Sequence, residues 1–167
     1  MGLFVTISDF TGKFAVSTGM YANTNIQSYI DRYEDIYLTE LFGISLYDLF
    51  IADLDVNDLP QATKYEKIFE AFKEEIGFQL IISKGMKDML VGFIYFEYMK
   101  DSITQTTPIG VVKQQSENSN PISAHTPIYL RYNESVKTYR AIQDYIMQNM
   151  STYPEFRGYV KQYAYWL

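Results

Sequence analysis

The chain has 167 residues, of which 47% are hydrophobic and 20% charged, so it is long enough for one globular domain with its own core but not for two. Its net charge of −6 at pH 7 argues against a general nucleic-acid binder, because neutralising phosphates takes clustered Lys and Arg. The absence of cysteine excludes disulfides, thiol nucleophiles and thiolate metal sites. The longest apolar stretch, residues 89–96, is far shorter than the roughly 20 residues of a membrane span, and no secretory signal is recognisable, so we expect a soluble, cytoplasmically made protein with no membrane partner.

Aromatic residues are enriched to 17%, with sixteen Tyr, eleven Phe and one Trp. Tyr combines contact area with a hydroxyl at small entropic cost, which suits half-wet interfaces, but the same residues also fill small cores. Both uses remain open at this point. Charge is uneven as well: residues 1–72 carry 11 acids against 4 bases, and residues 73–167 carry 9 acids against 10 bases. Two such halves favour head-to-tail contact in an assembly.

The first half of the chain predicts an arm followed by helices. Residues 1–22 hold short apolar runs broken by glycines, which indicates an extended N-terminal arm with one or two strands. Thr24 and Gln27 form a capping box, which predicts a helix start, and Gly43 marks the helix end. An apolar stripe at helical spacing supports this first helix: Ile26, Tyr29, Ile30, Tyr33, Tyr37 and Leu41. Further helices are expected at residues 45–54 and 63–72, with a loop at 55–60 between them.

The second half predicts two long helices separated by a polar excursion. Residues 76–82 are expected to be extended, and Ser83 to cap a helix over 84–102 whose apolar residues lie all round it, so that helix should be central. Gln, Asn, Ser and Thr dominate residues 103–125, which predicts a loop or β-like arm that a neighbour orders. Thr126 and Pro127 start a last helix that ends near 149, and Pro154 follows.

The predicted fold is therefore mainly α: a small helical bundle with an extended N-terminal arm, a polar central loop and an aromatic C-terminal tail. The expected organisation is an arm at 1–22, a helical domain at 23–152 with the loop 103–125 inserted, and a tail at 153–167. Since Pro154 and Gly158 separate the tail from the last helix, we expect its aromatic residues to serve an interface more than the core. These residues are Tyr153, Phe156, Tyr159, Tyr163, Tyr165 and Trp166.

Residues with catalytic or metal-binding potential are few. His125 is the one histidine, with no Ser or Cys motif to serve as its nucleophile. The segment from Asp53 to Asn57 opens like a calcium loop, but position six is Asp58 where glycine is needed and position twelve is Lys64 where glutamate is needed. We therefore expect a solvated acidic loop there and no metal or cofactor.

Two sets of acids on helices have both a catalytic and a structural interpretation. Asp31, Glu34 and Asp35 share a helix face, which fits paired carboxylates or, more simply, a solvated face opposite the tyrosine stripe. Glu97 lies in the apolar helix, where a buried carboxylate needs a partner, and an ion pair with Arg131 or Arg140 is the preferred interpretation over catalysis. No catalytic residue is assigned, and the chain is not expected to be an enzyme.

Three segments carry a resemblance to a known family: Ser28-Tyr-Ile-Asp-Arg-Tyr-Glu-Asp-Ile-Tyr-Leu38 running into Leu41-Phe-Gly43-Ile-Ser-Leu-Tyr-Asp-Leu-Phe50, Ser83-Lys-Gly-Met-Lys-Asp-Met-Leu90 running into Gly92-Phe-Ile-Tyr-Phe-Glu-Tyr98, and Tyr132-Asn-Glu-Ser-Val-Lys-Thr-Tyr139. In sequence and order these segments resemble the head–tail connector (neck ring) proteins of tailed bacteriophages, and their sequence is most similar to the ring proteins of crAss-like phages. The resemblance spans most of residues 24–157.

The resemblance implies a structural virion protein of the neck, made in the cytoplasm of a host bacterium. It further implies a homo-oligomeric ring, commonly a dodecamer, that joins the portal protein to other neck and tail proteins and lines the channel through which genome DNA passes. An acidic lumen would let DNA pass without binding, which agrees with the net charge. The alternative from another class is a soluble monomeric or dimeric protein-binding module that uses the 103–125 loop to hold its partner.

Overall fold

The computed structural model describes residues 2–16, 20–107, 110–113, 125–157 and 160–165, and it confirms the mainly α class. Its helices are α1 (Met20–Phe42), α2 (Ile44–Ala52), α3 (Thr63–Phe69), α4 (Met86–Ile103) and α5 (His125–Gln148). Two antiparallel hairpins accompany them, one formed by β1 (Phe72–Ile76) and β2 (Gln79–Ser83), the other by β3 (Thr104–Thr107) and β4 (Gly110–Lys113).

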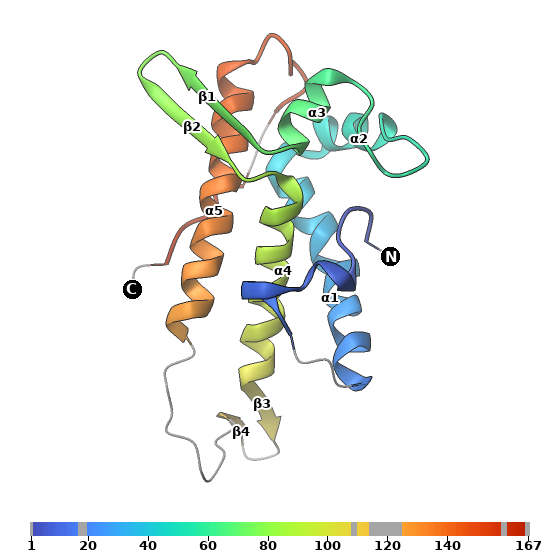
Figure 1. Cartoon of the computed structure of the whole chain (residues 1–167), viewed down its shortest axis with the longest axis vertical. Coiled ribbons are helices and arrows are strands. Elements are labelled where there is room, and N and C mark those ends of the chain that lie inside the picture. The colour runs from blue at the N-terminus through green and yellow to red at the C-terminus, as the bar shows by residue number, and fades with distance from the viewer. Residues whose placement is uncertain (1, 17–19, 108–109, 114–124, 158–159, 166–167) are drawn as a thin grey trace.

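The three long helices run side by side along the long axis of the molecule, with α4 between α1 and α5 (Figure 1). The short helices α2 and α3 and the β1–β2 hairpin lie at one end of this layer, and the β3–β4 hairpin lies at the other (Figure 1). At the end that carries α2, α3 and the β1–β2 hairpin, which is uppermost in Figure 1 and is called the upper end below, the hairpin lies on the side of α5 and α2 lies on the side of α1. The two sides of the molecule therefore present different elements.

Helix α4 is the centre of the core, as its all-round apolar sequence predicts. Residues 89–98 are buried without a break, which covers every side of almost three helical turns. A helix with no solvated face has to be covered by several elements at once. Here α1, α5, α3 and the N-terminal segment all contact it.

Helices α1 and α5 each present one apolar face to α4. Ile26, Ile30, Leu38 and Leu41 are fully buried in α1, while Val136, Tyr139, Ile142 and Ile146 are buried in α5. Helix α1 begins at Met20, so the predicted start at Thr24 is wrong, since Met20 and Ala22 favour helix and extend it by one turn. Gly43 separates α1 from α2 as predicted, with φ at +71°, a value that side chains other than glycine rarely adopt.

The excess of tyrosine serves mainly the core, which answers the question that composition leaves open. The buried tyrosines are Tyr37, Tyr65, Tyr95, Tyr98, Tyr132, Tyr139 and Tyr153. Two of their hydroxyls reach backbone carbonyls: Tyr139 donates to the Val160 carbonyl at 2.7 Å, and Tyr153 donates to the Lys64 carbonyl at 2.6 Å. Because these bonds satisfy the polar ends of the two rings, Tyr139 and Tyr153 fill the core without leaving their hydroxyls unpaired.

The N-terminal segment is part of the core, so the predicted extended arm does not hold for residues 2–16. These residues form two short 3₁₀ helices, Ile7–Asp9 and Gly12–Phe14, and no strand. Four apolar side chains bury against the bundle: Phe4, Val5, Phe10 and Phe14. Glu134 of α5 pairs with Lys13 at 2.5 Å and with Lys84 at 2.9 Å, and these two bonds lower its pKa to about 2. The arm prediction failed because four spaced apolar residues in irregular backbone carry no periodicity.

Between α3 and α4 the chain makes a hairpin where the sequence predicts a longer helix and one extended run. Helix α3 ends at Phe69, and β1 begins at Phe72, which packs against Tyr145 of α5 with ring centroids 5.0 Å apart. Gly77, with φ at +64°, allows the two-residue turn that reverses the chain. Ser83 is the last residue of β2 and accepts a hydrogen bond from the Gly85 N–H at 3.1 Å; since α4 begins at Met86, Ser83 lies two residues before the cap position and the predicted cap is wrong.

The polar stretch 103–125 contains the β3–β4 hairpin, in which Thr104 pairs with Lys113 and Thr107 with Gly110. The expectation of a β-like arm agrees with these residues, while residues 114–124 lie outside the described part of the chain. The C-terminal residues run back over the bundle: the Val160 N–H donates to the Glu40 carbonyl at 3.0 Å, and Arg140 donates to the Gln162 carbonyl at 2.7 and 3.0 Å.

Helices α4 and α5 approach each other closely at Gly92. A Cβ added there would lie 2.0 Å from the Ser135 Oγ and 3.3 Å from the Phe14 Cζ. Ser135 is itself 2% exposed, and its hydroxyl has no hydrogen-bond partner among the described residues.

We expect Gly92→Ala to lower the free energy of unfolding by about 1–2 kcal/mol, because overpacking outweighs the gain in helix propensity. Ser135→Ala alone should change stability little, since its hydroxyl is unpaired, and adding it to Gly92→Ala should recover part of the loss. Urea unfolding of the wild type, both single variants and the double variant measures this. A Gly92→Ala chain as stable as the wild type would contradict the close packing.

Candidate interaction surfaces

Glu97, the acid in the central helix, is neutralised inside the subunit. It is 8% exposed; one carboxylate oxygen accepts the Tyr37 hydroxyl at 3.1 Å, and the other pairs with Lys100 one turn later. Burial, and then the charge of Glu97, raise the pKa of Tyr37, which keeps that hydroxyl a donor. The predicted partners were wrong: Arg131 donates to the Tyr95 hydroxyl, and Arg140 to the Gln162 carbonyl. Lys100 lies three residues after Glu97 on the same helix, a spacing at which two side chains are neighbours, and it is the base that pairs with the carboxylate.

The three acids of α1 are separated by their surroundings. Asp31 accepts from the Gln27 amide at 2.8 Å, and Asp35 accepts from the Tyr47 hydroxyl. Glu34 is 3% exposed because it shares the buried row of α1 with Ile30 and Leu38, so its predicted place on a solvated face is wrong. Its Oε1 accepts the Phe4 N–H at 2.6 Å, which anchors the N-terminal segment, while its Oε2 has no partner among the described residues.

The acidic loop after α2 is built by hydrogen bonds from its own backbone. Asp53 accepts the N–H groups of Gln61 and Ala62 at 2.9 and 2.8 Å, and Asp55 accepts those of Asn57 and Leu59 at 2.8 and 2.9 Å. These bonds occupy the carboxylates that a calcium loop would use. No three His, Asp or Glu side chains within the described residues cluster closely enough to hold a metal ion. His125 is the first residue of α5.

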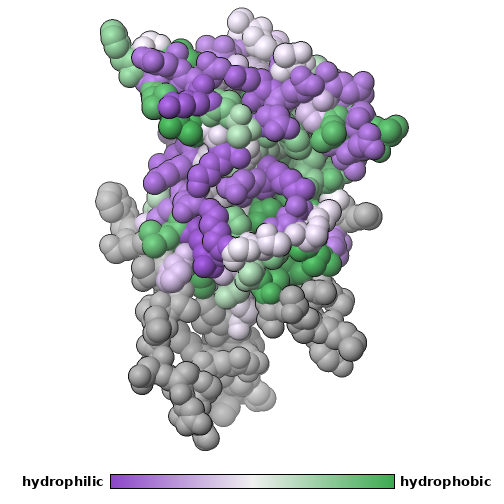
Figure 2. Space-filling view, in the orientation of Figure 1, coloured by the Kyte–Doolittle hydropathy of each residue, from purple (hydrophilic) through white to green (hydrophobic). Residues whose placement is uncertain are grey.

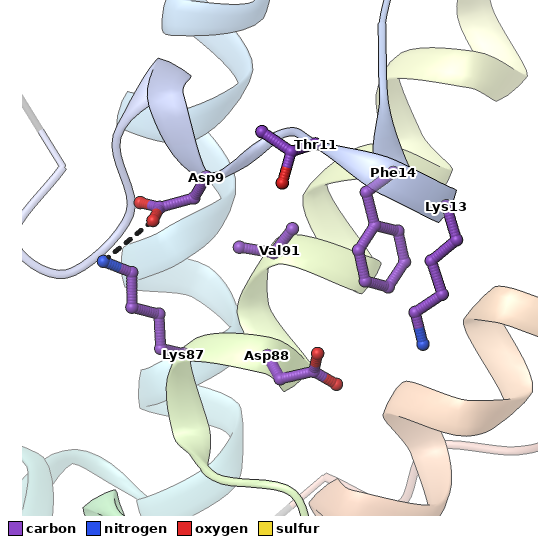
Figure 3. Close-up of a pocket in the computed structure, with 7 residues that line it drawn as sticks. All are labelled: Asp9, Thr11, Lys13, Phe14, Lys87, Asp88 and Val91. Atoms are coloured by element: carbon purple, nitrogen blue, oxygen red, sulfur yellow. Dashed lines mark ion pairs between the residues drawn. The ribbon is translucent and has the colours of Figure 1, made fainter.

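A shallow pocket lies between the N-terminal segment and the start of α4 (Figure 3). Asp9 and Lys87 form an ion pair of 3.0 Å across it, and Lys13 is paired with Glu134 of α5. Phe14 and Val91 supply its apolar wall (Figure 3). The charged groups of this pocket thus attach the N-terminal segment to the bundle.

The aromatic tail, predicted as an interface, divides between the core and the surface. Tyr153 and Phe156 are 1% and 5% exposed, so these two rings are unavailable to an interface and that part of the prediction is wrong. Tyr165 is 46% exposed and packs on Tyr129, with ring centroids 4.6 Å apart, and Tyr163 is 70% exposed. Tyr159 and Trp166 lie outside the described residues.

The largest exposed apolar side chains at the upper end of the molecule belong to two elements that the sequence did not single out. On the β1–β2 hairpin, Phe78 is fully exposed and Leu80 and Ile82 are 54% and 52% exposed; we call these three residues the hairpin surface. Leu80 and Ile82 share one face of β2, opposite the buried Ile81. The Gly77 turn is the sequence signal that would have placed Phe78 at a hairpin tip.

The second element is α2 with the loop that follows it. Its exposed apolar residues, which we call the α2–loop surface, are Ile44, Leu49, Val56 and Leu59. Apolar side chains are visible over both elements among hydrophilic ones, at the upper left over the hairpin and at the right-hand edge over the loop (Figure 2).

Comparison with known families, with curated proteins and with solved structures finds no match to this chain. Among the described residues no helix is both long and apolar enough to span a membrane.

We expect Phe156→Ala to destabilise the subunit by about 3 kcal/mol, because a buried ring is replaced by a cavity. Tyr163→Ala, in the same tail, should stay within about 0.5 kcal/mol of the wild type since its ring is exposed. Urea unfolding of the full chain gives both values. Equal effects of the two substitutions would show that the tail is not divided in this way.

Glu34 should make stability depend on pH, because burial raises the pKa of its carboxyl above the ordinary 4.5 although the N–H groups of residues 3–5 lower it. A raised carboxyl pKa contributes stability below the ordinary value that is lost as the pH rises through the folded-state value. We therefore expect the free energy of unfolding of wild type relative to Glu34→Gln to fall as the pH rises above the ordinary carboxyl value of 4.5.

Asp31→Asn on the same helix is the matched control. The hydrogen bond from Gln27 holds the pKa of Asp31 below its ordinary value, so its contribution is lost on acidification and the sign reverses. Urea unfolding carried below pH 3.8 reports the Asp31 difference, and unfolding carried above pH 4.5 reports the Glu34 difference. A Glu34→Gln difference that grows as the pH rises would contradict the burial of the carboxyl.

Proposed function

We propose that this protein is a ring subunit of the head–tail connector of a tailed phage. In this role several copies close into a ring between the portal protein and the tail, and the ring lines the channel through which the genome leaves. The protein binds other proteins and is not a catalyst. The alternative is a monomeric or dimeric binding module that uses residues 103–125.

The order of elements supports the proposal together with the resemblance of the three segments. The Leu41-Phe-Gly43 turn joins α1 to the short α2, the long apolar α4 follows, and a β-hairpin excursion precedes the last helix α5. The first resembling segment covers parts of α1 and α2, the second runs from the end of β2 into α4, and the third lies within α5. The net charge of −6 is compatible with a channel that DNA crosses without binding.

The observation that carries the proposal is the exposure of the hairpin surface. A Phe at 108% of its reference exposure, next to Leu80 and Ile82, is unfavourable for a chain that remains alone in water. A projecting two-stranded hairpin is also marginal by itself, and contact with a neighbour stabilises it. This feature favours assembly over the alternative module, whose contacts would be made by residues 103–125 at the other end of the molecule.

We expect electron cryomicroscopy of the native particle to place this chain in a closed ring of many copies at the portal vertex. Purified chain mixed with its candidate portal protein should give a complex with several copies of the chain per portal ring, measured by native mass spectrometry. Single copies in the particle, or a complex of one chain with one partner that requires residues 103–113, would overturn the ring and favour the alternative module.

A further inference from the structure

Residues 160–165 of the tail, which we call the return segment, run along α5 with neither helix nor strand of their own. Most of their side chains face solvent: Val160, Tyr163 and Tyr165 are 48%, 70% and 46% exposed. The Tyr165 ring packs on Tyr129 of α5. The attachment of this segment therefore depends more on hydrogen bonds than on the burial of apolar area.

Side chains of α5 bind the backbone of the return segment. The Asn133 side chain pairs with both backbone groups of Tyr165: its amide donates to the Tyr165 carbonyl and its oxygen accepts the Tyr165 N–H, each at 2.8 Å. Because this pairing uses only main-chain atoms of the segment, it holds an extended backbone whatever side chain follows it. Two further side chains of α5 bind carbonyls of the segment at 2.7 Å, Tyr139 that of Val160 and Arg140 that of Gln162.

The end of α1 supplies the other wall of this groove. Helix α1 ends at Phe42, so the carbonyls of its last turn lack partners within the helix. The Val160 N–H donates to the Glu40 carbonyl at 3.0 Å. Gln143 of α5 donates at 3.4 Å to the Leu41 carbonyl and to the Val160 carbonyl. The groove between α1 and α5 thus presents donors and acceptors that the backbone of an extended peptide satisfies.

The groove also recognises two side chains of the return segment. The Gln162 amide donates to Glu40 Oε2 at 2.6 Å, and its oxygen accepts the Tyr132 hydroxyl at 3.1 Å. Three residues later, the ring of Tyr165 lies 4.6 Å from that of Tyr129 between centroids. Main-chain hydrogen bonds that hold a peptide, together with sites for a few of its side chains, are the features of a peptide-binding groove.

The start of the tail is fixed to its own subunit, and the connection to the return segment is short. Tyr153 and Phe156 are buried, whereas Arg157 is exposed. Gly158 lies in this connection in the sequence, and glycine permits backbone conformations that other residues rarely adopt. A different path through these few residues would bring the segment to another copy with every contact in the groove unchanged. Exchange of an identical element between copies costs little for this reason.

We propose that the groove between α1 and α5 binds an extended peptide with glutamine and tyrosine three residues apart, and that in the assembled ring this peptide is the return segment of a neighbouring copy. An isolated copy keeps its own segment there, because the short connection gives it a high effective concentration. In a ring the segment of the neighbour is also held close, and its exchange links one copy to the next. Each copy gives a segment to one neighbour and receives one from the other, which is a heterologous contact that closes with the ring. The identity of the peptide rests on the proposed ring.

Binding of a labelled peptide to the full chain tests the groove. The peptide has the sequence of residues 157–167. Gln162→Ala in the chain removes the bonds of its own segment to Glu40 and Tyr132 and leaves the groove intact. Since the peptide and the segment compete for one site, we expect the peptide to bind this variant about tenfold more tightly than the wild type, measured by fluorescence anisotropy.

The same substitution in the peptide should have the opposite effect. A peptide with Gln162→Ala should bind the Gln162→Ala chain about tenfold more weakly than the unchanged peptide, because it lacks the two bonds. Lys161→Ala in the peptide is the matched control, since Lys161 is exposed, and it should bind within about twofold of the unchanged peptide. Equal binding of all three peptides, or no binding to the Gln162→Ala chain at about 1 mM peptide, overturns the groove as a peptide site.

Cysteine crosslinking identifies whose segment occupies the groove, because the chain has no cysteine of its own. Met147 of α5 and Tyr163 of the return segment line the same surface pocket and are 37% and 70% exposed. Full-chain Met147→Cys and Tyr163→Cys variants are mixed and assembled into rings whose closure electron microscopy has verified, and a short bismaleimide is added. We expect dimers that join position 147 of one copy to position 163 of another, identified by peptide mass spectrometry. The dilute, unassembled mixture should give no such dimer, and one chain with both substitutions should link within itself.

The outcomes separate the exchange from the ring itself. Closed rings in which the mixed variants give no 147-to-163 dimer, and in which the doubly substituted chain links only within itself, overturn the exchange and leave the ring in place. A chain present as single copies in its native particle overturns the ring and the neighbour as the source of the peptide. Closed rings with 147-to-163 dimers, together with tighter peptide binding by Gln162→Ala, support both.

Discussion

The burial of residues 89–98 of α4 on every side is the constraint on which the rest of the structure depends. An apolar helix without a solvated face cannot be covered by one partner, so α1, α5, α3 and the N-terminal segment all pack on it. The close approach at Gly92 lets α5 and Phe14 pack against the same turn of α4. The N-terminal segment belongs to the core for this reason, although it has almost no regular secondary structure.

Enclosing α4 brings polar groups into the interior, and the chain provides partners for most of them. Tyrosine hydroxyls reach carbonyls and carboxylates across the bundle, so the rings of α1, α4 and α5 stack while their polar ends are satisfied. Glu97 is paired with Lys100 and Tyr37, and Glu34 accepts the backbone of the N-terminal segment. The buried acids thus hold elements of the fold together.

The apolar residues that the core does not bury lie on the β1–β2 hairpin and on the loop after α2, at one end of the three-helix layer. The hairpin and the α2 loop are both too short to bury their own apolar residues, and both project beyond the three-helix layer (Figure 1). The two sides differ because α4 separates α1, which leads into α2, from α5, beside which the hairpin lies (Figure 1).

The sequence by itself determined the mainly α class, the central position of α4, the glycine turn between α1 and α2, and the span of α5 to within two residues at each end. Each of these depends on local periodicity or on a glycine conformation, which neighbouring residues specify. Only the tertiary structure decided the burial of the N-terminal segment, the partners of Glu97 and Glu34, and the division of the tail into core and surface. Those outcomes depend on contacts between residues far apart in the chain, such as Phe4 with Glu34 and Tyr153 with Lys64. The exposure of Phe78 is also a tertiary outcome. The Gly77 turn places Phe78 at the tip of a hairpin, but only the arrangement of the other elements leaves its ring uncovered among the described residues.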